Sequence, residues 1–72
     1  NTVLGSGAGY LMSSGNRNTV IGNGAVFAGT GIEDTTAVGR HALRDATGWY
    51  NTALGSAAGD NITTGGYNIT IG

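Results

Sequence analysis

Residues 1–8 read NTVLGSGA, and the same pattern returns as NTVIGNGA at 18–25, TTAVGRHA at 35–42 and NTALGSAA at 51–58. A truncated fifth copy, NITIG, occupies 68–72. The copies start at residues 1, 18, 35, 51 and 68, so successive starts lie 17, 17, 16 and 17 residues apart. So constant a period indicates an array of equivalent structural units, and we expect residues 1–72 to form a single repeat array.

The length of the unit decides the fold class. Helical repeats need about 33 residues or more, and 16 to 17 residues also cannot hold a strand, a crossover helix and a return. The unit fits one coil of a parallel β-solenoid (β-roll): a short strand, a turn, a second extended segment after each alanine, and a second turn. Its start is rich in β-branched residues, which favour strands. We therefore predict an all-β solenoid whose parallel strands stack about 4.8 Å apart, near residues 2–4, 19–21, 36–38, 52–54 and 69–71.

Equivalent positions of the coils should form columns with distinct roles. The fourth position is always a branched aliphatic residue and is expected to point inward, facing the alanine of the eighth position across a thin coil. The predicted core is Leu4, Ile21, Val38, Leu54, Ile71, Ala8, Ala25, Ala42 and Ala58. Alternation along a strand then sends the third position outward. Because exposed apolar stripes usually meet a partner, this column is the expected contact with other copies of the chain, with a lightly exposed strand face as the alternative: Val3, Val20, Ala37 and Ala53.

Two polar columns precede the apolar ones. Asn occupies the first position in every copy except that of Thr35, and Thr occupies the second in every copy except that of Ile69. Stacked Asn and Thr side chains can form hydrogen bonds along a column, as ladders in cross-β structures do. We predict a structural role for both columns.

Composition excludes several classes of function. The chain has no Lys, three Arg, a net charge of −1 and 10% charged residues, so it lacks the basic stripe of a nucleic-acid binder. With no Cys and a single His, we expect no disulfide, no metal site and no cofactor. No apolar run approaches the roughly 18 residues of a membrane span.

Catalysis has little support in the sequence. His41 lies near Arg44 and Asp45, and Ser6 or Ser56 would be the serine of a Ser-His-Asp triad. The spacing of these residues does not place a nucleophile and a base within hydrogen-bond distance. The glycines of GSGAG at 5–9 lack the spacing and the Lys of a phosphate-binding loop. We expect a non-enzymatic protein with no catalytic residues.

Aromatic and Asn residues leave two binding hypotheses open. Trp49, Tyr50 and Tyr67 could form a glycan-binding platform, whereas ring stacking between coils is the structural alternative. Asn61 and Asn68 each begin an Asn-x-Thr acceptor pattern for N-glycosylation, a pattern that is common by chance. Regular Thr columns on a flat solenoid also suit ice binding.

The segment Asn-Thr-Ala-Leu-Gly-x-x-Ala at 51–58, followed by Thr-Gly turns and further units of the same type, resembles the head repeats of YadA-like trimeric autotransporter adhesins. It is also similar to repeats in bacteriophage tail fibres and large bacterial surface proteins. The resemblance covers essentially the whole chain and implies a left-handed β-roll, a homotrimer and a location on a cell surface or a virion tail fibre. The units here are longer than those of typical adhesin heads.

These expectations combine into one functional prediction. The chain is expected to be a structural segment of an extracellular adhesive fibre, either a surface adhesin or a phage tail fibre, that mediates assembly and surface attachment. Its expected partners are copies of itself, an end-to-end continuation of the fibre, and a surface glycan or receptor. A carbohydrate-binding or ice-binding β-solenoid is the alternative.

Overall fold

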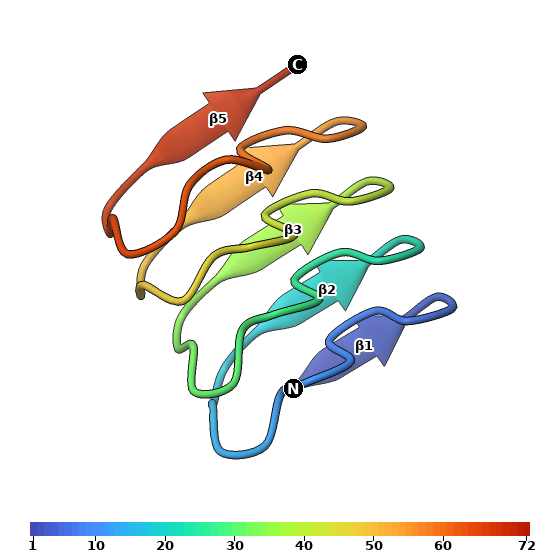
Figure 1. Cartoon of the computed structure of the whole chain (residues 1–72), viewed down its shortest axis with the longest axis vertical. Helices are drawn as coiled ribbons and strands as arrows, with labels where there is room; N and C mark the ends of the chain where they lie inside the picture. Colours follow the sequence, from blue (N-terminus) through green and yellow to red (C-terminus); the bar gives the residue numbers. More distant parts are fainter.

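Five short strands lie one above the other in a single parallel sheet, with all arrows pointing the same way (Figure 1). The computed structural model describes residues 1–72 and is an all-β solenoid of about four turns, each of about 17 residues. The sheet order is β1-β2-β3-β4-β5. The strands are β1 (Thr2–Leu4), β2 (Thr19–Ile21), β3 (Thr36–Val38), β4 (Thr52–Leu54) and β5 (Ile69–Ile71). The predicted strands and their parallel stacking are confirmed.

Equivalent residues of successive coils pair with each other throughout the sheet. Thr2 pairs with Thr19 and Thr19 with Thr36, each 17 residues on. The third coil is one residue shorter, yet Thr36 pairs with Thr52, its own equivalent. The turn at 47–50 therefore absorbs the missing residue and leaves the register of the strands unchanged.

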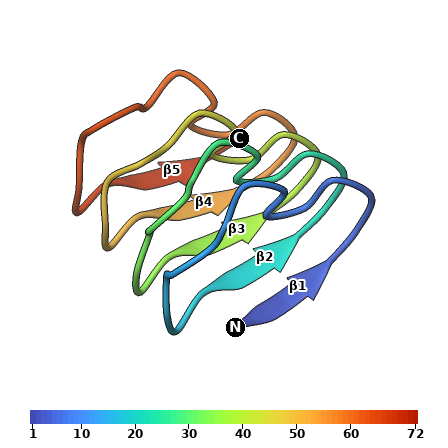
Figure 2. The same cartoon turned by 60° about the horizontal axis from the view of Figure 1, so that its bottom comes forward.

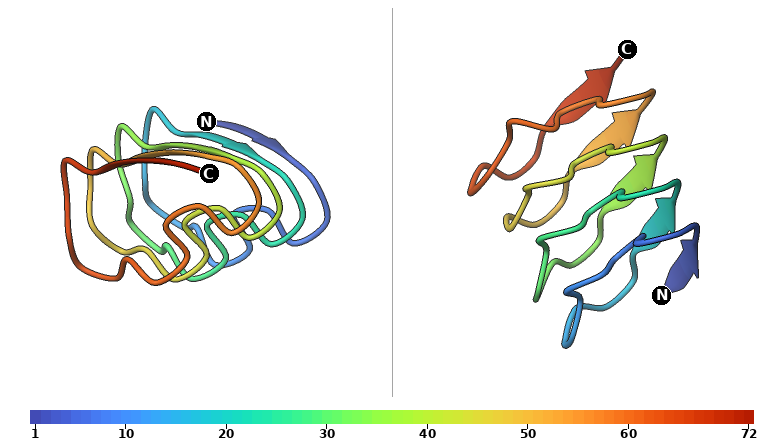
Figure 3. Two further views of the ribbon diagram at one scale, coloured as in Figure 1. Left: turned by 90° about the horizontal axis from the view of Figure 1, so that it is seen from above. Right: turned by 45° about the vertical axis from the view of Figure 1, so that its right-hand side comes forward.

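The side of each coil opposite the strands is a run of turns, so the predicted second extended segment is wrong. In the third coil the backbone N–H groups of Ala42, Arg44 and Ala46 each donate to the carbonyl three residues earlier, at 3.1 Å. His41 and Leu43 have φ values of 60° and 51°, which an extended strand cannot contain. Figures 2 and 3 show the resulting contrast between the strand side and the kinked side of the coil.

The strands point their third residues into the coil and their fourth residues out. Val20, Ala37 and Ala53 are fully buried, whereas Leu4 and Leu54 are 65% and 51% exposed. The prediction of an inward fourth position is therefore wrong for Leu4, Ile21, Val38, Leu54 and Ile71. The prediction of an outward third position is equally wrong for Val20, Ala37 and Ala53; Val3 shares their orientation but is 44% exposed in the first coil, where no coil covers it.

The reason for this inversion lies in the first position. Both the third and the fourth positions carry apolar residues, so alternation alone cannot decide which of the two faces inward. A shift of one residue in this assignment moves every side chain to the opposite face of the strand. The Asn side chains of the first position form their hydrogen bonds inside the coil, and the third position shares that face of the strand. The alanine wall was predicted correctly, since Ala25, Ala42 and Ala58 are buried and Ala8 packs against the core.

The first-position Asn ladder closes one corner of the first, second and fourth coils, whereas Thr35 replaces Asn in the third. Asn51 Oδ1 accepts hydrogen bonds from the backbone N and the Nδ2 of Asn68, at 3.1 and 3.0 Å. Asn51 Nδ2 donates to the carbonyl oxygens of Gly48 and Gly65, at 3.3 and 3.0 Å. Asn18, two units earlier, is bonded in a similar way: its Nδ2 donates to the carbonyl oxygen of Ile32 at 2.8 Å, and its Oδ1 accepts from the backbone N–H of Thr35 at 3.0 Å. The predicted structural role of the Asn column is confirmed.

The remaining core comes from positions that look irregular in the sequence. Val26 and Ile32 fill the second coil and Leu43 fills the third, all fully buried. Small residues stand beside them: a Cβ on Gly29 would lie 2.7 Å from a methyl carbon of Val26, and one on Gly59 would lie 3.0 Å from a methyl carbon of Leu43. Small residues therefore stand next to the large ones, within a coil or in the next, and leave room for them in the narrow interior.

Candidate functional site

The outward side of the sheet is an uncharged surface made by all five strands. We call it the outer sheet face and define it by the second and fourth positions of the five strands: Thr2, Thr19, Thr36, Thr52, Ile69, Leu4, Ile21, Val38, Leu54 and Ile71. It contains one Thr column and one aliphatic column, with no charged residue in either. Leu54 is 51% exposed and Ile71 is 74% exposed. Sequence reasoning had placed the aliphatic column inside the coil and so missed this surface.

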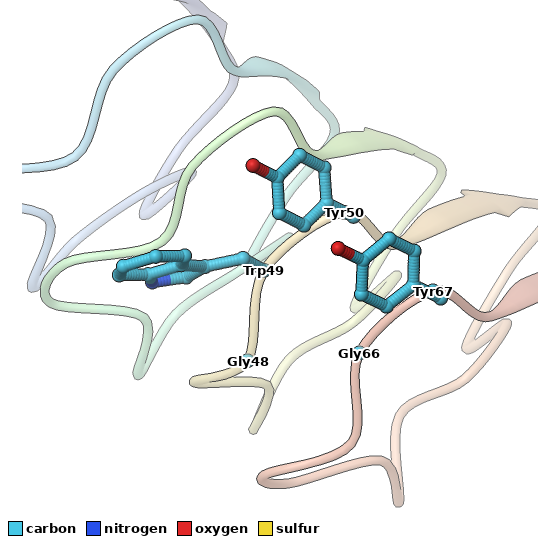
Figure 4. Close-up of a pocket in the computed structure, with 5 residues that line it drawn as sticks. All are labelled: Gly48, Trp49, Tyr50, Gly66 and Tyr67. Atoms are coloured by element: carbon cyan, nitrogen blue, oxygen red, sulfur yellow. The ribbon is translucent and has the colours of Figure 1, made fainter.

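A second candidate lies at the corner where the chain enters β4 and β5. Gly48, Trp49, Tyr50, Gly66 and Tyr67 line an open hollow of about 430 Å³. Figure 4 shows the two tyrosine rings side by side with their hydroxyl groups pointing the same way, and the indole of Trp49 extending to that side. The structure thus brings together the three aromatic residues predicted to form a binding platform, and adds the two glycines to its lining.

The rings of this corner are held in place by the protein. The Tyr50 and Tyr67 rings stack with centroids 4.8 Å apart and an interplanar angle of 13°. The indole Nε1 of Trp49 donates a hydrogen bond to the carbonyl oxygen of Gly31 at 3.0 Å. The predicted stacking between coils is therefore present, and it leaves the three side chains 43 to 81% exposed.

An ion cluster joins the first two coils near the same corner. Arg17 Nε and Nη2 donate to the two carboxylate oxygens of Asp34 at 2.7 and 2.8 Å, and Nη2 also donates to Glu33 at 3.4 Å. The hydrogen bond from Arg17 holds the pKa of Asp34 below its ordinary value of 3.8. The same contact raises the pKa of the guanidinium. This cluster was not predicted from the sequence. Arg17 and Asp34 are oppositely charged and occupy equivalent positions of neighbouring coils, 17 residues apart, and this spacing could have predicted the ion pair.

The residues considered for catalysis are not brought together. His41 lies over Gly24, where an added Cβ would come within 2.5 Å of the imidazole, and its side chain makes no hydrogen bond to Ser6, Ser56 or Asp45. Arg44 forms an ion pair with Asp45 at 3.3 Å. The described side chains include no group of three His, Asp or Glu residues able to hold a metal ion.

The two glycosylation motifs differ in accessibility. Asn61 lies exposed in a turn, whereas Asn68 is half-buried and its side-chain amide donates to Asn51 at 3.0 Å. Of the two, only Asn61 presents a free side chain for modification. The chain contains no helix with the length and apolar character needed to cross a bilayer.

The fold and these surfaces define the class of protein, a β-solenoid built from a repeated coil. No protein-family model, curated protein or solved structure matches the chain.

Proposed function

We propose that this β-solenoid is a structural segment of an extracellular adhesive fibre, in which the outer sheet face packs against other copies of the chain. The observation that carries the proposal is the exposed aliphatic column of that face. An uncharged strip of this kind is typical of a protein contact surface. The resemblance to adhesin heads and tail-fibre repeats supports a trimer and a role in surface attachment.

The occupant of the face follows from its regularity. Each column repeats with the spacing of parallel strands, about 4.8 Å, so its ridges and grooves match a partner surface that has the same period. A second copy of this chain has that period along its full length. This proposal revises the subunit contact expected from the sequence, because the third position is buried and the fourth faces outward. The contact residues become Leu4, Leu54 and Ile71, which are exposed, and Ile21 and Val38, which are partly exposed.

A charge placed in the aliphatic column tests the proposal. Leu54→Asp is expected to convert the oligomer to monomer, because a carboxylate in the contact would be desolvated without a partner. Leu54→Lys should do the same with the opposite charge. Size-exclusion chromatography with light scattering measures the mass, and circular dichroism checks the fold.

Asn61→Asp is the matched control, since it adds one negative charge at an exposed turn away from the outer sheet face. It should leave the mass of the oligomer unchanged. A monomeric parent chain, or Leu54 variants that keep the parent mass, would contradict the proposal.

Ice binding is the second candidate for the same face, because Thr2, Thr19, Thr36 and Thr52 all lie on it beside the aliphatic column. Ile69 interrupts the Thr column at β5. Thermal hysteresis above that of a buffer control would favour ice as the partner of the face, and its absence would favour self-association.

A further inference from the structure

The aromatic corner presents rigid ring surfaces that the fold itself does not require. Trp49, Tyr50 and Tyr67 line one side of the hollow and remain 49, 43 and 81% exposed. The equivalent positions of earlier coils carry Asn16, Arg17, Glu33 and Asp34, so the coil accepts polar side chains there. The geometry of the turn therefore does not explain why aromatic residues stand at these positions.

The backbone at this corner sharpens that argument. Tyr50 and Tyr67 have φ values of 63° and 60°, a left-handed conformation that is unfavourable for bulky residues and natural for Gly or Asn. Arg17 and Asp34 hold the same position in the earlier coils with φ values of 58° and 51°, so the turn is common to the coils and accepts different side chains. The turn therefore does not require a tyrosine, and the choice of two successive tyrosines depends on their side chains.

The hydrogen bonds of the corner define what it can offer a ligand. The Trp49 indole N–H is already bonded to Gly31, so the indole presents its ring rather than a donor. The hydroxyl groups of Tyr50 and Tyr67 make no hydrogen bond within the protein and point to the same side of the stack (Figure 4). The guanidinium of Arg17, the one cation of the ion cluster, already donates hydrogen bonds to Asp34 and Glu33. The site therefore offers flat apolar surface and two hydroxyl groups, with no free positive charge.

We propose that this hollow is a binding subsite for a neutral saccharide, specifically a β-linked pyranose chain with equatorial hydroxyl groups. Such a sugar has flat faces made of C–H groups, which pack on aromatic rings, and its edge carries hydroxyl groups that can pair with Tyr50 and Tyr67. The hollow of about 430 Å³ is open along the surface, which suits a chain that continues beyond the site. Pre-organised rings bind with little loss of side-chain entropy. The site is separate from the outer sheet face and does not depend on self-association.

The single Trp of the chain gives a direct assay. Titration with cellotetraose and with chitotetraose should produce a saturable change in the fluorescence of Trp49. Tyr67→Ala removes the most exposed ring and should weaken binding about tenfold or more. Tyr67→Phe keeps the ring stack but lacks the hydroxyl, and should weaken binding by a smaller factor while leaving the fold intact.

The chain contains its own matched control. Tyr10 and Phe27 stack with the same centroid distance of 4.8 Å, but they line no hollow. Tyr10→Ala should lower the melting temperature about as much as Tyr67→Ala and leave sugar binding unchanged. The proposal is overturned if neither tetrasaccharide changes the fluorescence at millimolar concentration, or if Tyr67→Ala and Tyr10→Ala bind equally well.

Discussion

Asn51 shows how much of the fold one side chain can organise. It is fully buried, and its amide satisfies two carbonyl oxygens at the corner while its oxygen accepts two N–H groups of Asn68 in the next coil. No buried side-chain nitrogen or oxygen in the structure is left without a partner. Buried polar groups are tolerated only when they are paired in this way, so each Asn of the ladder both closes its own coil and fixes it to the next.

Asn51→Ala is expected to destabilise the chain strongly. The substitution removes the four hydrogen bonds of the Asn51 side chain, and each hydrogen bond contributes about 0.5–1.5 kcal/mol to stability. We expect a loss of about 2–4 kcal/mol in the free energy of unfolding, measured by urea denaturation. Thr52→Ala, at the exposed neighbouring position, is the control and should change stability by less than about 0.5 kcal/mol. Equal losses for the two variants would contradict the role given to the ladder.

At the scale of the element, the strand triplets were predictable and their orientation was not. All five strands, their parallel pairing and the alanine wall follow from the period and from β-branched residues. The residues that face inward could not be predicted, because Val20 and Ile21 are both apolar. A strand of three residues is too short for alternation to show which of them is buried. Ile32 and Leu43 were missed because the residue type in their columns changes from coil to coil. The aromatic corner was predicted from its columns, since stacking follows directly from register.

The glycine that ends each strand sets how closely the coils approach. Gly39 has a φ of 136°, and an added Cβ would lie 2.3 Å from the carbonyl oxygen of Gly55 in the next coil. Such a contact cannot be relieved by a side-chain movement, because the neighbour is backbone. Gly5 of the GSGAG run is explained in the same way, since its Cβ would meet the backbone of Gly22 at 2.8 Å, whereas Gly7 and Gly9 have left-handed φ values of 71° and 59°.

Gly39→Ala should therefore destabilise the chain by at least about 3 kcal/mol, through backbone strain and the contact with Gly55 together. Gly72→Ala separates these two causes, because Gly72 also has a positive φ, of 107°, but no neighbour within 4 Å of its Cβ. We expect the second variant to lose less than about 1 kcal/mol. Thermal unfolding followed by circular dichroism compares the two, and similar losses would show that close approach of the coils is not the main cause.

On the scale of the whole molecule, every contact of the sheet is made between neighbours in sequence order. β1 pairs only with β2, and β5 only with β4, whereas the three inner strands pair on both sides. Stability in such an array is approximately a sum of the units and their interfaces. The strands at the two edges should therefore open at a lower free energy than the inner ones.

Hydrogen exchange of the 1–72 chain measures this gradient. Backbone amides of β1 and β5 are expected to exchange at least about tenfold faster than those of β2, β3 and β4, because opening an edge strand breaks one ladder rather than two. Peptide-level mass spectrometry resolves the five strands. Uniform exchange along the chain would instead indicate that the array unfolds as one cooperative unit.

The shortened third coil shows that the strand of each coil is aligned by its pairing with the strand of the neighbouring coil, not by the number of residues between them. A deletion in one turn is corrected before the next strand begins, as the pairing of Thr36 with Thr52 demonstrates. Errors of length therefore do not accumulate. A gene encoding such an array could therefore gain or lose whole coils, or lose single residues from a turn, and still encode a regular stack. The turns could then change in sequence and gain binding residues without disturbing the strands.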